Sequence, residues 1–240
     1  MRPTDPLQTH LKRTSFANGA ELANALAARV AGALTAAIEA RGRATLAVSG
    51  GTTPKNFFIA LSNLPIAWNK VTVTLVDERM VPPSNDRSNH RLASLFLLQN
   101  HAAEAAFVPL YSSPGDATAM AAAAAGKIDA LAPPLDVVVL GMGTDGHTAS
   151  FFPGGTTLAA VTDPACGQSV MAIEAPGAGE PRLTLTLPRI VDAGLIVLHM
   201  EGDEKHSVLT RALEAGDDAE MPVRAVLRHA RTAVELFWAP

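Results

Sequence analysis

The 240-residue chain has a single cysteine, few aromatic residues and more acidic than basic side chains. Because one cysteine cannot form an intramolecular disulfide, stability must come from a packed core, as in proteins of a reducing compartment. Aromatic residues make up only 5% of the chain while 48% is hydrophobic, a balance that favours helices packed on a sheet over a β-sandwich. The net charge of −4 argues against a surface made for nucleic acid or anionic membrane.

Long apolar runs are also missing. No stretch approaches the ~18 uninterrupted apolar residues of a membrane-spanning helix. The first ten residues, MRPTDPLQTH, lack the basic and then apolar segments of a signal peptide. We therefore expect a cytoplasmic protein without nucleic-acid or membrane partners, folded as a single domain over residues 1–240. Cys166 lies in the loop-like segment DPACG with no histidine nearby in the sequence, so we do not interpret it as a nucleophile.

Apolar periodicity and turn residues predict alternating helices and strands. Helices are expected over 20–40, 55–64, 88–99, 115–131, 203–214 and 223–228, and strands over 44–48, 71–76, 107–111, 135–140, 169–174, 182–187, 195–200 and 232–238. Residues 156–167 show no clear periodicity and are predicted to form a loop. The alternation predicts an α/β fold with a doubly wound, mostly parallel sheet and helices on both faces.

The segment LDVVVLGMGTDGHTASFFPG, residues 135–154, is the most informative stretch of the chain. Its glycines, Gly141, Gly143 and Gly146, spell the G-x-G-x-x-G pattern of dinucleotide-binding loops directly after an expected strand. That pattern also requires a helix after the glycines and a second strand that ends in an acidic residue about 20 residues later. Here a proline and two glycines interrupt the following segment, so a dinucleotide site is disfavoured.

Asp145 and His147 follow the same strand. A histidine held at the glycine-rich end of a strand can accept a proton from water and return it to a leaving group, because the pKa of a free imidazole lies near neutrality. Metal ligation is the alternative role. It is disfavoured because His147 has neither a second histidine four residues away nor a cluster of cysteines.

The loop SGGTTP joins an expected strand to an expected helix. The backbone N–H groups of Gly50 and Gly51 can approach an anion closely, and the hydroxyls of Thr52 and Thr53 add donors at the helix N-terminus. The loop is therefore a candidate phosphate site, although an ordinary tight turn has the same composition. Ser49 is disfavoured as a nucleophile because AVSGG lacks the first glycine of the G-x-S-x-G motif.

Charged residues in two other places can complete such a site. Asp77, Glu78 and Arg79 directly follow an expected buried strand, where they form either a solvated loop or a set that orients a substrate. Arg182 begins one expected strand and Lys205 lies at the start of an expected helix. Both are surface charges unless their elements end near SGGTTP, where they would balance the charge of an anion.

The segments AVSGGTTP, LVDERMVPPSNDRSNHRL, LDVVVLGMGTDGHTASFFPG, RLTLTLPRI and GDEK, in this order, resemble the family of 6-phosphogluconolactonases and glucosamine-6-phosphate isomerases over about residues 44–210. The resemblance is closer to the lactonases. It implies a single-domain, Rossmann-like fold shared with glucosamine-6-phosphate deaminase. It also implies hydrolysis of 6-phosphoglucono-δ-lactone to 6-phosphogluconate in the oxidative pentose phosphate pathway, without cofactor or metal, by a monomer or small homo-oligomer.

The resemblance also implies roles for individual residues. His147 would be the general base that activates water, and either Asp145 or Asp77 would orient its imidazole or bind sugar hydroxyls. Backbone N–H groups of the glycine-rich loops or Arg79 would stabilise the oxyanion, and Arg87 is a candidate lid contact. The phosphate would be held by one loop and two cations: Gly50, Gly51, Thr52, Thr53, Arg182 and Lys205.

Two other functions are compatible with the same motifs. Glucosamine-6-phosphate deaminases have DEY after the second strand and a glutamate shortly after the histidine, in a segment similar to GHIAFNEP. This chain has Arg79 in place of that tyrosine and reads GHTASFFPG, without a glutamate before Pro153. A non-catalytic sugar-phosphate sensor would need a DNA-binding segment and a basic face, whereas the first 43 residues offer one long helix and little excess charge.

Overall fold

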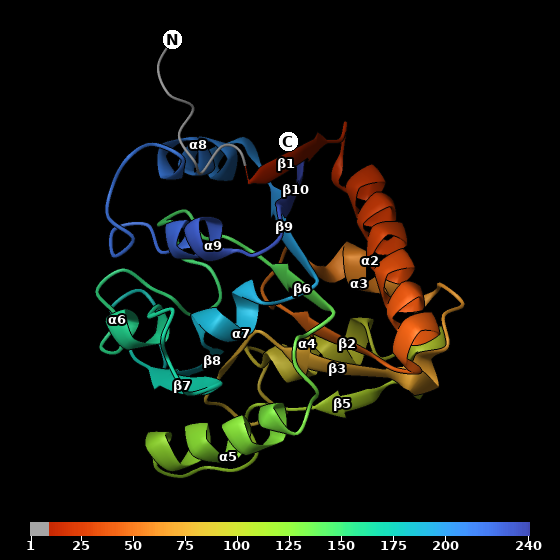
Figure 1. Ribbon diagram of the computed structural model, residues 1–240, viewed down its shortest axis with the longest axis horizontal. Coiled ribbons are helices and arrows are strands. Elements are labelled where there is room, and N and C mark those ends of the chain that lie inside the picture. The colour runs from red at the N-terminus through yellow and green to blue at the C-terminus, as the bar shows by residue number, and fades with distance from the viewer. Residues whose placement is uncertain (1–9) are drawn as a thin grey trace.

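The computed structural model describes residues 10–240 and has a central sheet of seven strands (Figure 1). All neighbouring strands of this sheet are parallel. In spatial order they are β1 (Leu11–Ser15), β10 (Val234–Ala239), β9 (Leu195–Glu201), β6 (Val137–Leu140), β2 (Ala44–Val48), β3 (Val71–Leu75) and β5 (Ala106–Val108). The parallel α/β sheet expected from the sequence is confirmed. The prediction about a signal peptide falls on residues that lie outside the described range, apart from His10.

A second sheet of three antiparallel strands lies beside the first. Its order is β4 (Asp77–Arg79), β8 (Arg182–Leu185) and β7 (Val170–Ile173). Val76 joins the two sheets, because its N–H donates to the Val48 carbonyl at 2.9 Å and its carbonyl accepts from Leu185 at 2.8 Å. The chain thus passes directly from β3 into β4. This places β4 just beyond the carboxyl edge of the central sheet.

Helices cover both faces of the central sheet. The helices of residues 10–240 are α2 (Gly19–Arg41), α3 (Lys55–Ser62), α4 (Asn89–Phe96), α5 (Ala117–Asp129), α6 (Leu158–Val161), α7 (Leu187–Val191), α8 (Asp203–Ala212) and α9 (Val223–His229), with 3-10 turns η1 (Trp68–Lys70) and η2 (Asn100–Glu104). In Figure 1, α2 and α3 lie on one side of the strands and α7, α8 and α9 on the other. The predicted doubly wound arrangement is therefore confirmed.

Helix α2 begins where the Asn18 side chain accepts from the Glu21 N–H at 2.9 Å, and it ends at Gly42, which has a φ of 74°. Among residues 10–240 it is the one helix long and apolar enough to cross a membrane, and 39% of its most apolar segment is buried. Its buried residues recur at helical spacing and pack against the sheet: Leu22, Ala23, Leu26, Ala27, Val30, Leu34 and Ala37. This pattern is typical of the core helix of a globular domain.

Several elements differ from the sequence prediction. Strand β1 was not expected, because in LKRTS only Leu11 is buried and the strand pairs with β10 alone at the edge of the sheet. Helix α6 forms inside the predicted loop 156–167, and α7 begins at Leu187, where a strand had been expected to end. The three-stranded sheet was also missed: the strands 169–174 and 182–187 were predicted, but their pairing with residues 77–79 depends on the tertiary fold.

The order of the strands creates a crevice between β2 and β6. From β2 the chain moves outward through β3 and β5, and it then returns to the other side of β2 to form β6, followed by β9 and β10. At such a switch point the loops after the two central strands diverge and leave room for a ligand. The loop after β2 contains SGGTTP and the loop after β6 contains GMGTDGH, so the fold brings the two principal sequence motifs together.

Candidate active site

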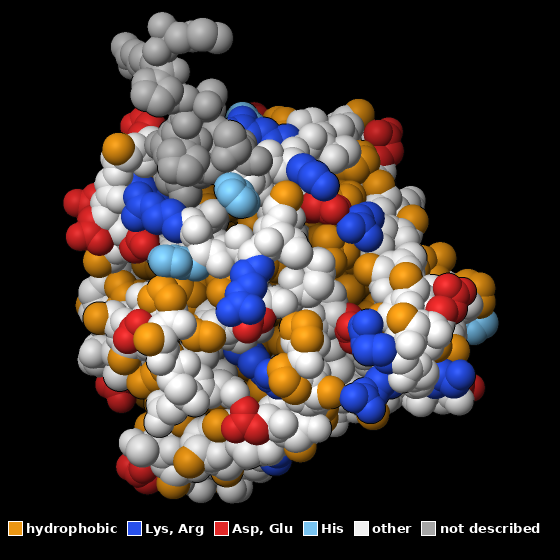
Figure 2. Space-filling model, in the orientation of Figure 1, with side chains coloured by type: hydrophobic (Ala, Val, Ile, Leu, Met, Phe, Trp, Pro, Cys, Tyr) orange, Lys and Arg blue, Asp and Glu red, His pale blue; other side chains and the backbone are white. Residues whose placement is uncertain are grey.

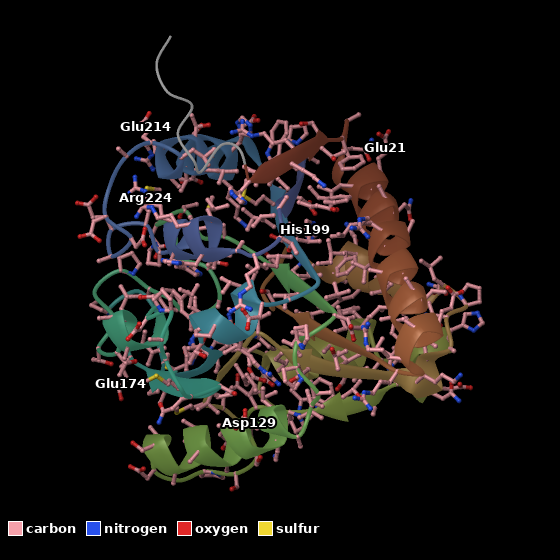
Figure 3. The ribbon with its side chains drawn as sticks, in the orientation of Figure 1. Glu21, Asp129, Glu174, His199, Glu214 and Arg224 are labelled. Atoms are coloured by element: carbon pink, nitrogen blue, oxygen red, sulfur yellow. The ribbon has the colours of Figure 1, made fainter. Side chains whose placement is uncertain are left out.

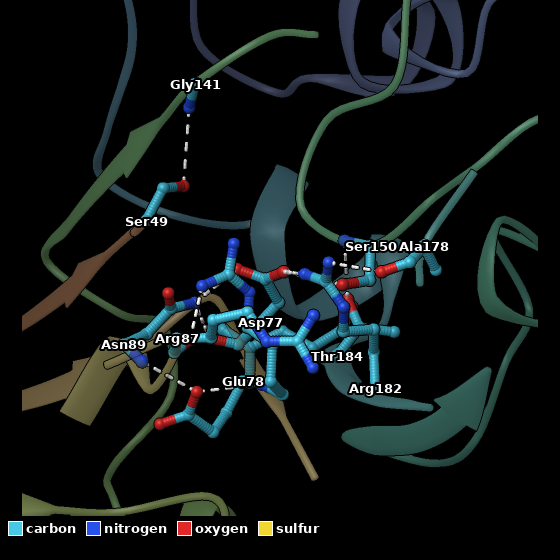
Figure 4. Close-up of polar contacts among 12 residues, drawn as sticks. Ser49, Asp77, Glu78, Arg87, Asn89, Gly141, Ser150, Ala178, Arg182 and Thr184 are labelled. Carbon is cyan, nitrogen blue, oxygen red and sulfur yellow. Dashed lines mark hydrogen bonds and ion pairs between the residues drawn. The ribbon is translucent and has the colours of Figure 1, made fainter. Parts of the chain in front are cut away.

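A cavity of about 200 Å³ occupies the switch point. All of the site residues predicted from the sequence line it, except Asp145 and Arg87. The two loops are joined by hydrogen bonds from the Ser49 N–H to the Val139 carbonyl at 3.0 Å and from the Gly141 N–H to Ser49 Oγ at 3.3 Å (Figure 4). On the face drawn in Figure 2, basic and acidic side chains are interspersed. An anionic ligand would therefore be bound by individual basic residues of the cavity rather than by a large basic surface.

His147 and Asp145 form a hydrogen-bonded pair within the loop after β6. The Nδ1 atom of His147 lies 2.6 Å from Asp145 Oδ1, which also accepts from the His147 backbone N–H at 3.1 Å. Burial raises the pKa of the Asp145 carboxyl, but the hydrogen bond and charge of His147 and the backbone donors together lower it below the ordinary value. An ionised Asp145 thus accepts a hydrogen bond from the Nδ1–H group and leaves Nε2 as the unprotonated nitrogen of the ring.

Two neighbours fix the position of the His147 ring. Phe152 packs against it in a tilted arrangement, with a distance of 4.2 Å between ring centroids and an angle of 32°. Gly143 lies beneath it, and a Cβ atom at this position would be 2.2 Å from both Nδ1 and Cε1 of the ring. A glycine is therefore needed at position 143 if the imidazole is to lie against the backbone.

Asp77 also lines the cavity, and none of the hydrogen bonds of residues 10–240 joins it to His147. It is 5% exposed and accepts from Ser150 Oγ at 2.5 Å and from Asn89 Nδ2 at 3.3 Å. Arg182 NH1 lies 3.6 Å from the same carboxylate (Figure 4). The structure thus separates the two aspartates that the sequence left undecided, since Asp145 contacts the imidazole and Asp77 belongs to a buried polar network.

The alternation of side chains in β4 explains how three adjacent charged residues are accommodated. Asp77 and Arg79 share one face of the strand, and Glu78 points to the other. Glu78 is 1% exposed and accepts four hydrogen bonds at the start of α4: from the N–H groups of Arg79, Asn89 and His90 and from Ser88 Oγ. Burial raises the pKa of Glu78 above its ordinary value, although these donors act to lower it. The solvated-loop interpretation is therefore wrong for Asp77 and Glu78.

Arg79 and Arg182 are directly opposite each other in the β4–β8 pair. Like charges in this arrangement repel, and Arg182 is only 8% exposed. Burial lowers the pKa of the Arg182 guanidinium below its ordinary value, and the charge of Asp77 partly compensates. Among residues 10–240, the Nε atoms of both arginines are buried and have no hydrogen-bond acceptor. Both residues line the cavity, so their guanidinium charges suit an anionic ligand.

The loop after β2 has the features of a phosphate site. Gly51 has a φ of 94°, and a Cβ atom at Gly50 would lie 1.8 Å from Asn89 Oδ1, so glycine is required at both positions. Lys205 reaches the loop from α8, and its Nζ donates to Thr53 Oγ1 at 3.2 Å. Lys205 is therefore not a plain surface charge, because its side chain ends at the SGGTTP loop, as expected for a cation of an anion site.

Arg87 lies at the rim and is not among the residues that line the cavity. Its guanidinium pairs with Glu180 at 2.8 Å, and its backbone carbonyl accepts from Arg79 NH1. These contacts link the loop after β4 to the loop before β8. The role of Arg87 as a lid contact stays a prediction.

Three residues of the site were missed in the sequence. Asn89 carried no signal in the sequence; its Nδ2 donates to the Asp77 carbonyl at 2.8 Å, and its Oδ1 lies against Gly50. Ser150 follows the histidine motif without a recognisable pattern of its own. His199 lies inside the apolar strand β9, far in sequence from any glycine-rich loop, and no feature of the sequence distinguishes it from a core residue.

In open parallel α/β sheets the ligand lies at the switch point. Here that point combines a Gly-Thr loop, the cations Arg182 and Lys205 and a carboxylate-paired histidine, which is the arrangement of an α/β enzyme site. Among the described residues, no group of three or more His, Cys, Asp or Glu side chains is arranged to hold a metal ion. The chain belongs to the family of glucosamine-6-phosphate isomerases and 6-phosphogluconolactonases, because the sequence model of that family matches residues 17–238.

Relatives within this family are similar over nearly their whole length. The chain is 59% identical to a 6-phosphogluconolactonase of Rhizobium meliloti, covering 94% of this chain and 97% of that protein. It is 40% identical to a 6-phosphogluconolactonase of Pseudomonas aeruginosa, with 94% and 93% covered. The solved structure of a 6-phosphogluconolactonase from Shewanella baltica superimposes with a TM-score of 0.93 at 40% identity, covering 96% of this chain and 98% of that one.

A monomeric glucosamine-6-phosphate deaminase also superimposes, with a TM-score of 0.78 at 17% identity over 95% of this chain and 97% of that one. At this level of identity the likeness shows a shared fold alone. The deaminase-like fold expected from the sequence is thus confirmed.

Proposed function

We propose that this enzyme hydrolyses 6-phospho-D-glucono-1,5-lactone to 6-phospho-D-gluconate, the second step of the oxidative pentose phosphate pathway. The observation that carries the proposal is one cavity that holds both a carboxylate-paired histidine and a Gly-Thr anion loop with its lysine. The relatives named 6-phosphogluconolactonase, at up to 59% identity, support the same substrate.

His147 acts as the general base in this proposal. With Nδ1 bonded to Asp145, Nε2 accepts a proton from a water molecule as the water oxygen attacks the lactone carbonyl carbon. The carbonyl oxygen becomes an oxyanion in the tetrahedral intermediate. When the carbonyl re-forms, the bond to the ring oxygen breaks and the imidazolium returns its proton to that oxygen. The product is an open-chain acid that then ionises.

Arg79 is the proposed donor to the oxyanion. Its side chain lines the cavity, and NH1 is held by the Arg87 carbonyl. A donor that is held before the reaction needs little reorganisation when the negative charge forms, which is the condition for effective oxyanion stabilisation. The backbone N–H groups of the loop after β6 remain the alternative source.

The phosphate is proposed to lie on the loop from Gly50 to Thr53, with Lys205 as the nearest cation. Arg182 contributes a second positive charge from β8, where the Ala178 carbonyl accepts from NH2 at 2.7 Å and Asp77 lies beside NH1. Fixed cations of this kind explain how a chain with a net charge of −4 binds a dianionic group.

The same geometry argues against a deaminase or isomerase reaction. In the deaminase-like pattern GHIAFNEP the glutamate falls five residues after the histidine, which corresponds to Phe152 in this chain. Phe152 packs against the His147 ring and has no group that can relay a proton. The proton pathway of a deaminase is therefore interrupted at this position.

The required rate acceleration is modest. A δ-lactone hydrolyses readily in water, and general base catalysis contributes about 10²- to 10⁴-fold. Together with positioning by the phosphate site, this is sufficient without a covalent intermediate. The proposal therefore assigns no nucleophilic role to Ser49 or Cys166.

The test is the substitution His147→Ala. We expect kcat to fall about 10²- to 10⁴-fold, because the base is lost, while KM for the phosphorylated lactone stays close to that of the wild type. A pH-stat assay with freshly prepared lactone measures both constants after correction for spontaneous hydrolysis. A raised KM with unchanged kcat would contradict the assignment of His147 as the base.

We further propose that residues 1–240 act as a single unit in the cytoplasm and bind a small sugar phosphate rather than nucleic acid or membrane. The mixed charges in Figure 2 and the buried stripe of α2 support this proposal. A single cooperative unfolding transition and recovery of the activity in the soluble cell fraction would be the expected results.

A further inference from the structure

Asn89 is a buried polar residue of the cavity wall that has no role in the reaction described above. Polar side chains such as Glu21 and Glu214 lie at the periphery of the molecule (Figure 3), whereas Asn89 is 2% exposed. It is the first residue of α4 and one of the residues that line the cavity. Burial of an amide is unfavourable unless the amide is hydrogen-bonded, so the contacts of Asn89 indicate what it does.

Strand β4 holds both the backbone and the side chain of Asn89. The backbone N–H donates to Glu78 Oε1 at 2.8 Å. The Nδ2 atom donates to the Asp77 carbonyl at 2.8 Å and lies 3.3 Å from Asp77 Oδ1 (Figure 4). Because the backbone and the amide are both bonded to the same strand, the side chain has little freedom to turn.

The Asn89 amide also lies against the phosphate loop. The three atoms nearest to a Cβ atom at Gly50 would all belong to Asn89: Oδ1 at 1.8 Å, Cγ at 2.2 Å and Nδ2 at 2.8 Å. Gly50 is not among the glycines with a positive φ. The nearest obstacle to a side chain at position 50 is therefore the Asn89 amide rather than the backbone conformation of the loop.

These contacts connect two parts of the phosphate site. Arg182 NH1 lies 3.6 Å from Asp77 Oδ2, so a continuous series of contacts runs from Gly50 through Asn89 and Asp77 to Arg182. A phosphate that is bound by the loop and by Arg182 needs a fixed spacing between them, because charge-assisted hydrogen bonds depend on geometry. Asn89 lies where that spacing is set.

We propose that Asn89 is a positioning residue of the phosphate site, whose amide holds Gly50 at the position from which the loop and Arg182 bind the phosphate together. This inference rests on the proposed function, because it assigns the loop and Arg182 to the phosphate of the substrate. It predicts that loss of the Asn89 side chain weakens phosphate binding and leaves His147 undisturbed. It also predicts that the effect of a side chain at position 50 depends on Asn89.

The first test compares Asn89→Ala with the wild type on 6-phosphoglucono-δ-lactone and on unphosphorylated glucono-δ-lactone. We expect KM for the phosphorylated lactone to rise about three- to tenfold, because the loop loses the group against which it lies. The value of kcat and KM for the unphosphorylated lactone should not change. The matched control is Asn63→Ala: Asn63 Nδ2 likewise donates to a backbone carbonyl, that of Ile59 at 2.8 Å, but at the exposed end of α3, and all constants should stay close to wild type.

The second test combines Asn89→Ala with Gly50→Ala. In the wild-type background a methyl group at position 50 would meet the Asn89 amide, so the loop must move by more than about 1 Å, and KM for the phosphorylated lactone should rise more than about tenfold. In the Asn89→Ala background the methyl group occupies the vacated space, and Gly50→Ala should raise KM by less than about twofold. In the Asn63→Ala background the full effect of Gly50→Ala should persist.

Independent effects of Asn89→Ala and Gly50→Ala would overturn the proposal, since Asn89 would then not determine the position of Gly50. Equal changes in KM for both lactones in Asn89→Ala would also overturn it, because they would indicate a general structural role. Circular dichroism and thermal unfolding identify a variant that fails to fold. If Asn89→Ala fails, Asn89→Ser, which keeps a hydroxyl but lacks Oδ1 and Nδ2, replaces it in the first test with the same expected result.

A failure of the proposed function can be distinguished from a failure of this inference. If the wild type hydrolyses neither lactone, the proposed function fails. Calorimetric binding of inorganic phosphate to the wild type, the two single variants and the double variant then tests the inference without turnover. A much smaller effect of Gly50→Ala in the Asn89→Ala background supports the inference, and equal effects in both backgrounds overturn it.

Discussion

Substitution of Gly143 by alanine tests how His147 is positioned. A Cβ atom at this site would lie 2.2 Å from two atoms of the His147 ring and 2.7 Å from Asp145 Oδ1. Ordinary carbon contacts are about 3.5 to 4.0 Å, so the ring must move by more than about 1 Å. A misplacement of about 1 Å in a catalytic group costs on the order of 10²-fold in rate. We therefore expect kcat of Gly143→Ala to fall about 100-fold.

The pH-stat assay on fresh lactone measures this effect, and Gly141→Ala is the matched control. A Cβ atom at Gly141 meets no atom within 4 Å, so His147 keeps its position and kcat should stay within about threefold of wild type. Both variants should retain the wild-type circular dichroism spectrum. Full kcat in a folded Gly143→Ala enzyme would refute the inference that the imidazole must lie against this backbone.

Further predictions concern individual charged groups. Because the pKa of Asp145 is lowered, its carboxylate stabilises the fold at pH values above the ordinary value of 3.8, and this contribution is lost as the pH falls through the lowered pKa. The difference in urea stability between wild type and Asp145→Asn should therefore shrink below about pH 3.8. A difference that does not depend on pH would contradict this. Because burial lowers the pKa of Lys205, against Glu201 and Glu204, calorimetric affinity for 6-phosphogluconate should decline before the pH reaches the ordinary lysine value of 10.5; constant affinity up to that pH would contradict the assignment. Glu78→Gln should destabilise the fold by about 2 to 3 kcal/mol in urea, because its buried acceptors serve four donors, and a loss of less than about 0.5 kcal/mol would be inconsistent with this.

The parallel sheet and its main helices were predictable because their side chains report their environment directly. Strands β2 and β6 are buried on both faces, so their residues form continuous apolar runs that end in glycine-rich loops. Parallel strands also place their carboxyl ends at one edge, and the loops after β2 and β6, about 90 residues apart in sequence, meet there.

The missed elements depend on tertiary partners. Strand β1 has four exposed residues of five and is defined by its pairing with β10. Strand β4 consists of three charged residues that resemble a solvated loop, and only the pairing with β8 and the four donors to Glu78 make them a buried strand. A sequence does not reveal such partners.

The same distinction holds for the site. His147 stood out because glycines surround it, whereas His199 lies in an apolar strand without any such signal. The sequence could not choose between Asp77 and Asp145, because the choice depends on distance. The structure places Asp145 2.6 Å from the imidazole and places Asp77 among Ser150, Asn89 and Arg182.

The central claim is that this site hydrolyses a phosphorylated lactone by means of His147. The most direct measurement follows acid release from fresh 6-phosphoglucono-δ-lactone and, in parallel, ammonia release from glucosamine 6-phosphate, with wild type and His147→Ala. The account predicts rapid acid release by the wild type, near-spontaneous release by the variant, and no ammonia from either. Ammonia release by the wild type, or undiminished acid release by the variant, would contradict it.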